Sequence, residues 1–414
     1  MGELYPRQFL KSLGPLFQGK RKESGFSVRD IARSANIAHT IVFDIENKKI
    51  VPNPETLEDL FGTLGIPLYK NAETLWPLRD TLDAFFEAFH QDRIHEMTLY
   101  YQSLRKGEEI LMHSPLRIEY MFTIMIHSLV IEERNVLSHI HDMESLRDCF
   151  TDYLGHTLEL LKGMNSFIAE DYDAAFEKLI GNEKRTTFET IRNLTYYYLA
   201  FISDRLFKKE LSLYYARIAT ENFSDANNFK RKLDLDLLLA KNMIEVGNLR
   251  TAQEYLDSIR YAITNSDADG SDKQWFRNLQ AFLSYIRKDY DEAFEFIKEA
   301  KADNFSAALL KAFIAYRKEN ISEAKNHLRS INGIKEQGNR LYAQSATIFL
   351  HRLGEEVDPE KLEHAIHYVL EHPLNFETLH ARMFFTNLII EYYENIRDYK
   401  RALEIAKTII PLRR

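Results

Sequence analysis

Residues 25–52 read GFSVRDIARSANIAHTIVFDIENKKIVP and predict two short helices joined by a tight turn. Val28, Ile31 and Ala32 give the first helix an apolar face at helical spacing. Ser27, directly before it, is a residue type that commonly caps a helix N-terminus. The first half of this stretch therefore predicts a small amphipathic helix.

The second half of the stretch predicts the partner helix. Asn36 is expected in the turn, because it tolerates the left-handed conformation better than most residues. Ile41, Val42 and Ile45 are expected to point inward, and Pro52 ends the segment. One more amphipathic helix follows, with apolar positions Leu57, Leu60, Phe61 and Leu64. Two short helices wedged between others are typical of a helix-turn-helix.

These residues resemble the phage-repressor (XRE-type) helix-turn-helix family. The matching steps are Gly25-Phe26-Ser27, Asp30-Ile31-Ala32, Asn36-Ile37-Ala38, Val42, Ile45-Glu46-Asn47 and Pro52. The chain departs from the family at Val28, Asn36 and Ala38, where Gln, Gly and Ser are usual. The resemblance implies that the second helix enters the major groove of DNA. It implies base contacts from Ala38, His39, Thr40 and Phe43, and phosphate contacts from Arg29, Arg33, Lys48 and Lys49. The alternative is that Phe43 is a core residue and the lysines form a solvated face.

Charge is distributed unevenly along the chain. The 414 residues carry a net charge of −8, which does not suit a protein coated for nonspecific nucleic-acid binding. Residues 1–68 hold nine basic and eight acidic groups, whereas the remainder holds 45 basic and 54 acidic ones. Residues 1–68, called the head below, are mildly basic, whereas the rest of the chain is acidic. This difference is compatible with a local DNA-binding face on the head.

From about residue 80 the spacing of apolar residues is helical, and short segments recur. Each segment is a small polar residue, a large apolar one, two variable residues and an alanine, as in Asp171–Ala175, Asn248–Ala252, Asp289–Ala293, Asn320–Ala324 and Asp398–Ala402. Twelve residues before four of these alanines lie Gly163, Ala240, Ala281 and Ala312. Weaker copies end at Ala216 and Ala365. Small residues at two fixed positions predict antiparallel helix pairs that approach closely.

The alanines are 31 to 41 residues apart, mostly more than the roughly 34 residues of a tetratricopeptide repeat. The array therefore looks like tetratricopeptide repeats with lengthened helices or loops, preceded by less regular helical pairs near 80–105 and 117–160. Such stacks wind around a concave groove that commonly holds extended peptides. A purely structural or dimerising scaffold is the alternative.

The alanine register predicts which residues of each first helix face the groove. They are Tyr198, Arg205, Asp234, Lys241, Trp275, Asn278, Phe282, Tyr285, Ser306, Phe313, Tyr316, Phe384, Asn387 and Glu391. Asn278 and Asn387 share a repeat position, and a side-chain amide can both donate to and accept from a peptide backbone. Trp275, Phe282 and Phe313 would form apolar pockets, although inter-repeat core is an equal alternative for each aromatic residue.

Other chemistry finds little support. Cys149 is the one cysteine, which excludes an internal disulfide and a cysteine-rich zinc site. The histidines around 113–156 are irregularly spaced, so no metal is expected, and the phosphate-binding and nucleophile-elbow motifs are absent. No signal peptide or membrane-spanning stretch is visible. We expect a cytoplasmic protein that is not an enzyme and needs no cofactor.

The whole chain resembles the peptide-pheromone-responsive regulators of Gram-positive bacteria and their phages, the group that includes Rap, Rgg, NprR, PlcR and PrgX proteins. The expected organisation is all-α, with a helix-turn-helix domain at 1–68, a linker at 69–80 and a repeat domain at 81–414. The resemblance implies a homodimer whose repeats bind a short signalling peptide, which alters dimer geometry and operator binding. Two alternatives stay open: a scaffold that sequesters a protein such as a response regulator, as Rap proteins do, and a scaffold with a vestigial head.

Overall fold

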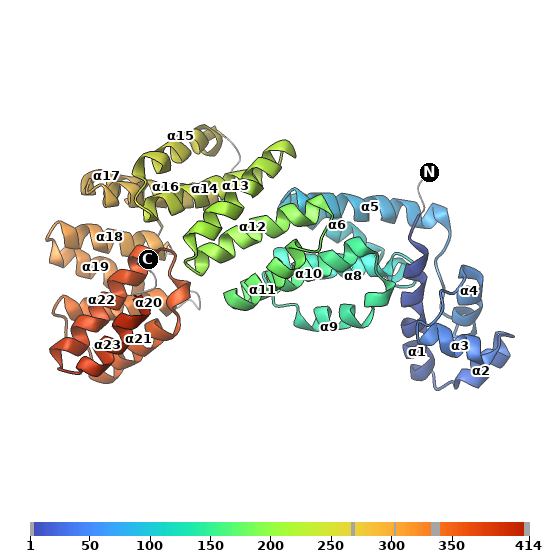
Figure 1. The fold of residues 1–414 in the computed structure, drawn as a ribbon. Coiled ribbons are helices and arrows are strands. Elements are labelled where there is room, and N and C mark those ends of the chain that lie inside the picture. The colour runs from blue at the N-terminus through green and yellow to red at the C-terminus, as the bar shows by residue number, and fades with distance from the viewer. Residues whose placement is uncertain (1–3, 266–269, 302–303, 333–339, 410–414) are drawn as a thin grey trace. The chain divides into compact units, whose positions relative to one another are not determined.

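The computed structural model describes residues 4–265, 270–301, 304–332 and 340–409, and these contain helices but no strand. The all-α prediction is confirmed. The chain divides into two compact units, Met1–Tyr198 and Leu199–Arg414, and helix α12 (Glu189–Arg205) begins in the first and ends in the second (Figure 1). We describe each unit by itself.

The first unit opens with the predicted helix-turn-helix. Its elements are η1 (Arg7–Ser12), α1 (Leu13–Glu23), α2 (Val28–Ser34), α3 (His39–Glu46) and α4 (Pro54–Thr63). Leu13, Phe17, Val42 and Phe61 are among the buried residues of one shared core. This core lies within residues 10–61, inside the expected head.

The predicted caps and turn of the head are present. The Ser27 side chain accepts a hydrogen bond from the Asp30 N–H, and the Asp30 carboxylate accepts one from the Ser27 N–H. This reciprocal capping box begins α2. Asn36 takes a φ of 54°, which confirms the left-handed turn between α2 and α3.

One inward position was predicted wrongly. Ile41 is 41% exposed, whereas Val42 and Ile45 are buried. Val42 and Ile45 are three residues apart and share a helix face, while Ile41 is turned by about 100° from Val42 and leaves that face.

The rest of the first unit is a set of helices that begins inside the expected linker. Residues 72–80 belong to α5, because the Asn71 side chain caps a helix that starts at Ala72. The elements are α5 (Ala72–His90), α6 (Ile94–Lys106), α7 (Glu108–Met112), α8 (Arg117–Val130), α9 (Leu137–Ser145), η2 (Arg147–Cys149), α10 (Asp152–Ile168) and α11 (Tyr172–Glu183). Cys149 is fully buried there.

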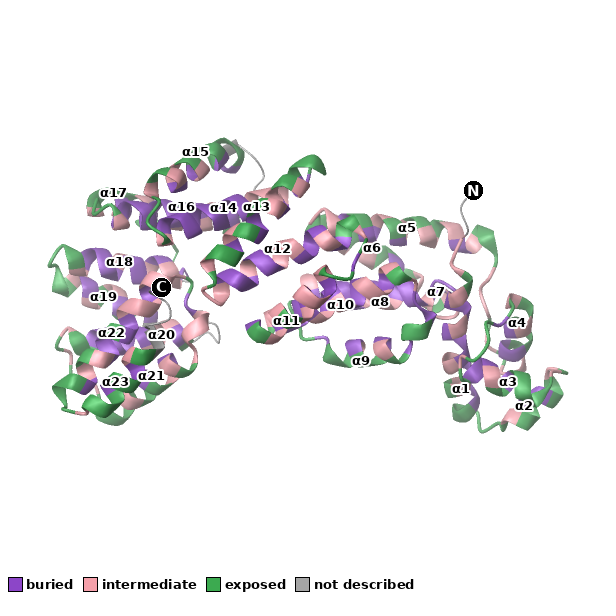
Figure 2. Cartoon of the chain, in the orientation of Figure 1, coloured by how far each residue is buried: buried purple, intermediate pink, exposed green. Residues whose placement is uncertain are grey.

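The second unit consists of antiparallel helix pairs. Its elements after α12 are α13 (Lys209–Asp225), α14 (Phe229–Glu245), α15 (Leu249–Asn265), α16 (Gly270–Ile286), α17 (Tyr290–Ile297), α18 (Phe305–Arg317), α19 (Ile321–Asn332), α20 (Arg340–Arg352), α21 (Pro359–Glu371), η4 (Pro373–Asn375), α22 (Leu379–Asn395) and α23 (Tyr399–Ile409). Helices α14, α16 and α18 are largely buried, while α15 and α17 keep exposed outer faces (Figure 2). The even-numbered first helices thus form the inner layer of the array.

The alanine ladder marks the contact between the helices of each pair. All seven ladder alanines, at 175, 216, 252, 293, 324, 365 and 402, are buried. Gly163 of α10 shows why the opposite position must be small: a Cβ there would lie 2.3 Å from Leu179 Cδ2 of α11. The predicted close approach of paired helices is confirmed.

The small polar residue of each repeated segment caps the second helix. Side-chain oxygens of Asp171, Asn248, Asp289, Asn320 and Asp398 accept hydrogen bonds from the backbone N–H three residues on, at 3.1–3.3 Å. The repeated segment is therefore a helix start as well as a packing signal.

Candidate DNA-binding face and ligand cavity

The recognition helix α3 presents several predicted base-contacting residues to solvent. His39 and Thr40 are exposed, and Phe43 is 47% exposed. Ala38 occupies the N-cap position without a side-chain hydrogen bond, as expected for alanine. The alternative that Phe43 belongs to the core is wrong.

A notch lies between α2 and α3 on this face. It encloses about 410 Å³ and is lined by Val28, Arg29, His39, Thr40, Phe43 and Asp44. Arg33 is exposed on the same helix as Arg29. Four of the eight predicted DNA contacts therefore meet at one hollow.

The two lysines after α3 have different surroundings. The Lys49 ammonium lies 4.7 Å from the centroid of the Phe43 ring and 3.5 Å from the Asp44 carboxylate. Lys48 instead has a φ of 59° and donates to Asp148 Oδ1 at 2.8 Å and to the Ser145 carbonyl. The structure thus engages Lys48 with the α9–η2 segment, where a free phosphate contact was expected.

A buried ion pair that the sequence did not reveal holds α3 against α1. Arg21 Nε donates to Glu46 Oε1 at 2.5 Å, and Arg21 Nη2 donates to Glu46 Oε2 at 2.9 Å. The side chains are only 8% and 1% exposed. Glu46 was noticed only as part of the family-like Ile-Glu-Asn step, and its partner lies 25 residues earlier.

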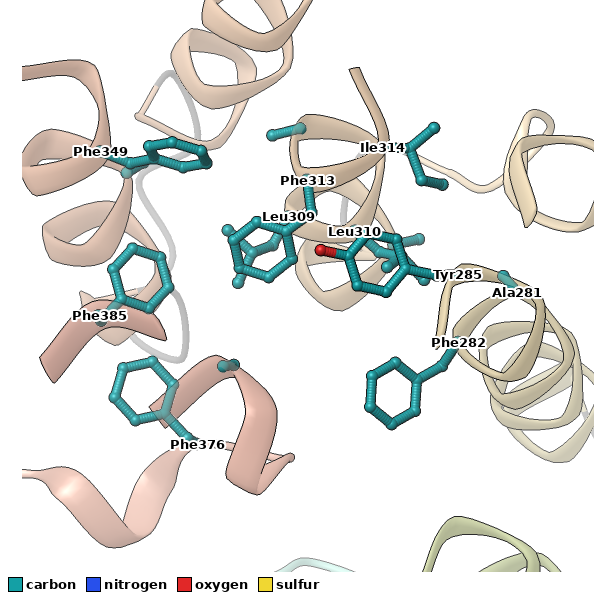
Figure 3. Packing of buried hydrophobic residues seen from close by; sticks show 14 of the residues in the cluster. Ala281, Phe282, Tyr285, Leu309, Leu310, Phe313, Ile314, Phe349, Phe376 and Phe385 are labelled. Carbon is teal, nitrogen blue, oxygen red and sulfur yellow. The ribbon is translucent and has the colours of Figure 1, made fainter. Parts of the chain in front are cut away.

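The second unit contains a cavity of about 500 Å³. Its helical lining comes entirely from the first helix of each pair, namely α12, α14, α16, α18, α20 and α22. Figure 3 shows Phe282, Phe313 and Phe376 approaching one space from three parts of the chain. This placement agrees with the predicted role of the first helices.

The cavity brings together seven of the fourteen predicted groove residues. Those that line it are Arg205, Lys241, Trp275, Asn278, Phe282, Ser306 and Phe313. The remaining predicted residues lie elsewhere. Tyr198 is in the first unit, and Asn387 and Glu391 are on exposed positions of α22.

Packing accounts for the other predicted residues that do not line the cavity. Asp234 pairs with Lys230 at 3.1 Å. Tyr316 packs its ring on Phe349. Tyr285 and Phe384 pack against Phe313, with ring centroids 6.3 and 4.6 Å apart, so for these the core alternative fits better.

A charge network closes the side of the cavity at α12 and α14. Asp204 accepts from Lys241 at 2.5 Å and from Lys209 at 2.6 Å, and Lys209 also pairs with Glu245. Burial would raise the pKa of Asp204, but the two ammonium groups outweigh it and hold that pKa below its ordinary value. Two acids balance two lysines, so these four groups together carry no net charge.

Two contacts near the cavity join segments that are distant in the sequence of the second unit. Glu245 Oε1 accepts a hydrogen bond from the Leu379 N–H at 2.8 Å, at the start of α22. The Arg382 guanidinium lies 4.7 Å from the centroid of the Phe207 ring. The cavity is therefore bounded by segments that lie more than 130 residues apart in sequence.

Asn278 faces a second amide at the cavity wall. Asn278 and Asn304 each donate to the other's side-chain oxygen at 3.3 Å. Asn304 also caps α18 by accepting from the Ala307 N–H. Both hydrogen bonds between the two side-chain amides are longer than the ordinary range for N–H···O bonds.

His380 lies at the aromatic end of the cavity. Its ring centroid is 5.5–6.1 Å from those of Phe282, Tyr285 and Phe313. Burial, reinforced by Arg317, lowers the pKa of His380, although Glu245 opposes the shift. The imidazole is accordingly neutral near pH 7.

Several lining residues were missed by sequence reasoning. Asp204, Tyr342, Phe376 and His380 all line the cavity. Asp204 is adjacent to Arg205, which was predicted, so the predicted groove positions of this helix left out one neighbouring residue. Tyr342 lies in α20, which pairs with the helix that contains Ala365. The repeated segment that ends at Ala365 is a weak copy, so the sequence did not indicate which residues of α20 face the groove.

No group of three or more His, Cys, Asp or Glu side chains within the described ranges is arranged to hold a metal ion. Across the same ranges, no helix combines the length and apolar character that crossing a membrane requires.

Comparison with known proteins places both parts of the chain. Residues 19–70 match the helix-turn-helix family, and no curated protein matches the sequence. A Rap protein complexed with competence and sporulation factor is 14% identical, with a TM-score of 0.67 over 81% of this chain and 98% of that one. The apo quorum sensor NprR from B. thuringiensis is 12% identical, with a TM-score of 0.59 over 82% and 99%. The Rap conjugation gene regulator of plasmid pLS20, complexed with the Phr* peptide, is 15% identical, with a TM-score of 0.53 over 81% and 96%.

The chain thus combines a helix-turn-helix domain with an α-helical repeat array. Its particular fold is that of the Rap and NprR proteins, which confirms the predicted fold group.

Proposed function

We propose that the protein is a transcription regulator that binds operator DNA through its head and a short signalling peptide through the cavity of its second unit. The observation that carries the proposal is the cavity itself, whose helical lining comes only from first helices of an array attached to a helix-turn-helix domain. A groove of this kind suits an extended chain better than a compact metabolite.

The lining chemistry favours a peptide with apolar side chains. Trp275, Phe282, Phe313 and Phe376 supply aromatic surface, and Asn278 supplies an amide that can pair with any peptide backbone. The charges of the Asp204–Lys241 wall are already satisfied within the protein. Burial of apolar side chains would supply most of the affinity, and the Asn278 amide would fix the position of the bound peptide.

The protein would act as a homodimer in which the peptide changes the spacing of two heads. A ligand shifts a conformational equilibrium only by its differential affinity for the two states. The Glu245–Leu379 and Arg382–Phe207 contacts join distant helices around the cavity, so a ligand there contacts segments whose separation defines the curvature of the second unit. The same contacts are the elements through which occupancy would alter dimer geometry.

The peptide half of the proposal is tested by panning the full chain against a library of short random peptides and measuring affinities by calorimetry. Asn278→Ala should weaken binding about three- to tenfold, the effect of one lost hydrogen bond in a closed site. Asn387→Ala is the matched control, because Asn387 has the same predicted repeat position but is exposed outside the cavity. Equal effects of the two substitutions, or no recovered peptide, would contradict the assignment.

The DNA half is tested by selecting duplexes from a random library with the full chain, followed by binding at several salt concentrations. Enrichment of an inverted repeat is expected for a dimeric regulator. If the chain binds a peptide but selects no specific duplex, whether or not the peptide is present, the result would instead favour the alternative in which the array sequesters a protein partner.

A further inference from the structure

The recognition surface of α3 has an unusual chemistry for reading bases by hydrogen bonds. Its sequence, HTIVFDIE, has none of the Arg, Lys, Asn or Gln side chains that make bidentate contacts to guanine or adenine. Its outward positions in the first turns are instead His39, Thr40, Ile41 and Phe43. This helix therefore offers apolar contacts from Ile41 and Phe43 and single hydrogen bonds from His39 and Thr40, but no bidentate contact from Arg, Lys, Asn or Gln.

Phe43 is placed for such a contact. It is 47% exposed and, with Val28 and the Thr40 side chain, lines the notch between α2 and α3. The group on the major-groove edge of DNA that suits an apolar notch is the C5-methyl of thymine. No other base of DNA carries a methyl group on that edge.

Charges around the notch suit a position against duplex DNA. The Lys49 ammonium lies over the Phe43 ring at 4.7 Å and beside Asp44 at 3.5 Å, so it restrains the ring and counters the carboxylate charge at the rim. Arg29 lines the notch on the α2 side. A negatively charged backbone can thus approach on both sides of an apolar centre.

We propose that Phe43, with Thr40 and Val28, reads thymine methyl groups, so that each operator half-site carries T·A pairs beneath the first turns of α3. The inference rests on the proposed DNA-binding function and adds the base class that the head selects. Lys49 acts as a positioning residue for the Phe43 ring.

The test uses the full chain and the duplex recovered by selection from the random library. Each thymine of the half-site is replaced in turn by deoxyuracil, which removes only the methyl group. Replacement of the thymines beneath α3 should weaken binding about fourfold each, the change expected for one buried methyl-sized group. Phe43→Ala should bind more weakly and lose this thymine dependence, whereas Phe43→Leu should retain much of it.

The matched control is Phe26→Ala, because Phe26 is a second exposed phenylalanine of the head, 44% exposed, that does not line the notch. This variant should keep the full difference between thymine and deoxyuracil duplexes. Specific DNA binding with no methyl dependence, or with a dependence that survives Phe43→Ala, overturns the inference and leaves the proposed function standing. Absence of any specific duplex overturns both.

Discussion

At the residue scale, the Arg21–Glu46 pair ties the recognition helix to the first helix of the head. Both side chains are nearly inaccessible and are joined by two hydrogen bonds. Breaking a buried pair leaves an uncompensated charge, which costs about 3–5 kcal/mol, whereas an exposed pair contributes about 0–1 kcal/mol. We predict that Arg21→Ala lowers the free energy of unfolding of the head by about 3 kcal/mol in urea titrations. Lys20→Ala, which removes the exposed pair with Glu23, should change it by less than about 1 kcal/mol; similar losses for both would contradict the buried role.

His380 provides a prediction about pH. Its pKa in the folded chain is lowered, chiefly by burial, so the unfolded chain binds a proton at a higher pH than the folded chain does. Stability from the neutral imidazole is therefore present above the unfolded pKa of about 6.5 and is lost as pH falls below it. Thermal unfolding between pH 7.5 and 5.5 should show a smaller decrease for His380→Asn than for the unchanged chain. An identical decrease would show that His380 does not titrate as its surroundings indicate.

Sequence reasoning succeeded at residues whose role is local. Ser27, Asn36 and the ladder alanines could be predicted because capping, left-handed turns and close helix approach depend on residue type and spacing. The Arg21–Glu46 pair and the Asp204–Lys241 pair could not, since their partners lie 25 and 37 residues apart and meet only when the helices pack.

At the element scale, α10 contains two glycines in contrasting environments. A Cβ at Gly163 would lie 2.3 Å from Leu179 of α11, whereas one at Gly155 would meet nothing within 4 Å. We predict that Gly163→Ala destabilises the chain by about 1–3 kcal/mol through overpacking. Gly155→Ala should stabilise it by about 0.5–1 kcal/mol, because alanine favours a helix interior more than glycine does. Denaturant unfolding of the two variants checks the signs, and stabilisation by both would contradict the close packing of α10 on α11.

The turns between helices show what the repeat pattern could not predict. The residue before the capping residue of each of the five clear repeated segments takes a left-handed φ, at Glu170, Gly247, Lys288, Glu319 and Arg397. Only Gly247 is a type that favours this conformation. The hydrogen bonds of the cap that follows offset the cost at the others, so the turn is determined by the whole segment. Trp275, Phe282 and Phe313, which line the cavity, belong to clear copies of the repeat, whereas Tyr342 belongs to a weak copy and was missed.

At the scale of the whole molecule, we propose that the protein combines DNA binding and peptide binding in one chain. The head has an exposed notch between α2 and α3, and the second unit has a cavity whose lining includes residues of α12 and α22. Coupling between two sites is reciprocal and typically amounts to about 5- to 150-fold in affinity. The proposal therefore requires that peptide occupancy change DNA affinity, and that DNA change peptide affinity by the same factor.

The most direct measurement is the affinity of the full chain for its selected duplex with and without a saturating concentration of the peptide recovered by panning. We predict that the peptide changes the affinity for DNA by at least about fivefold, in either direction. Asn278→Ala should require more peptide to produce the change while leaving the affinity of the free protein for DNA unaltered. A peptide that occupies the cavity and leaves DNA affinity unchanged, in the presence of intact specific DNA binding, would contradict the central claim.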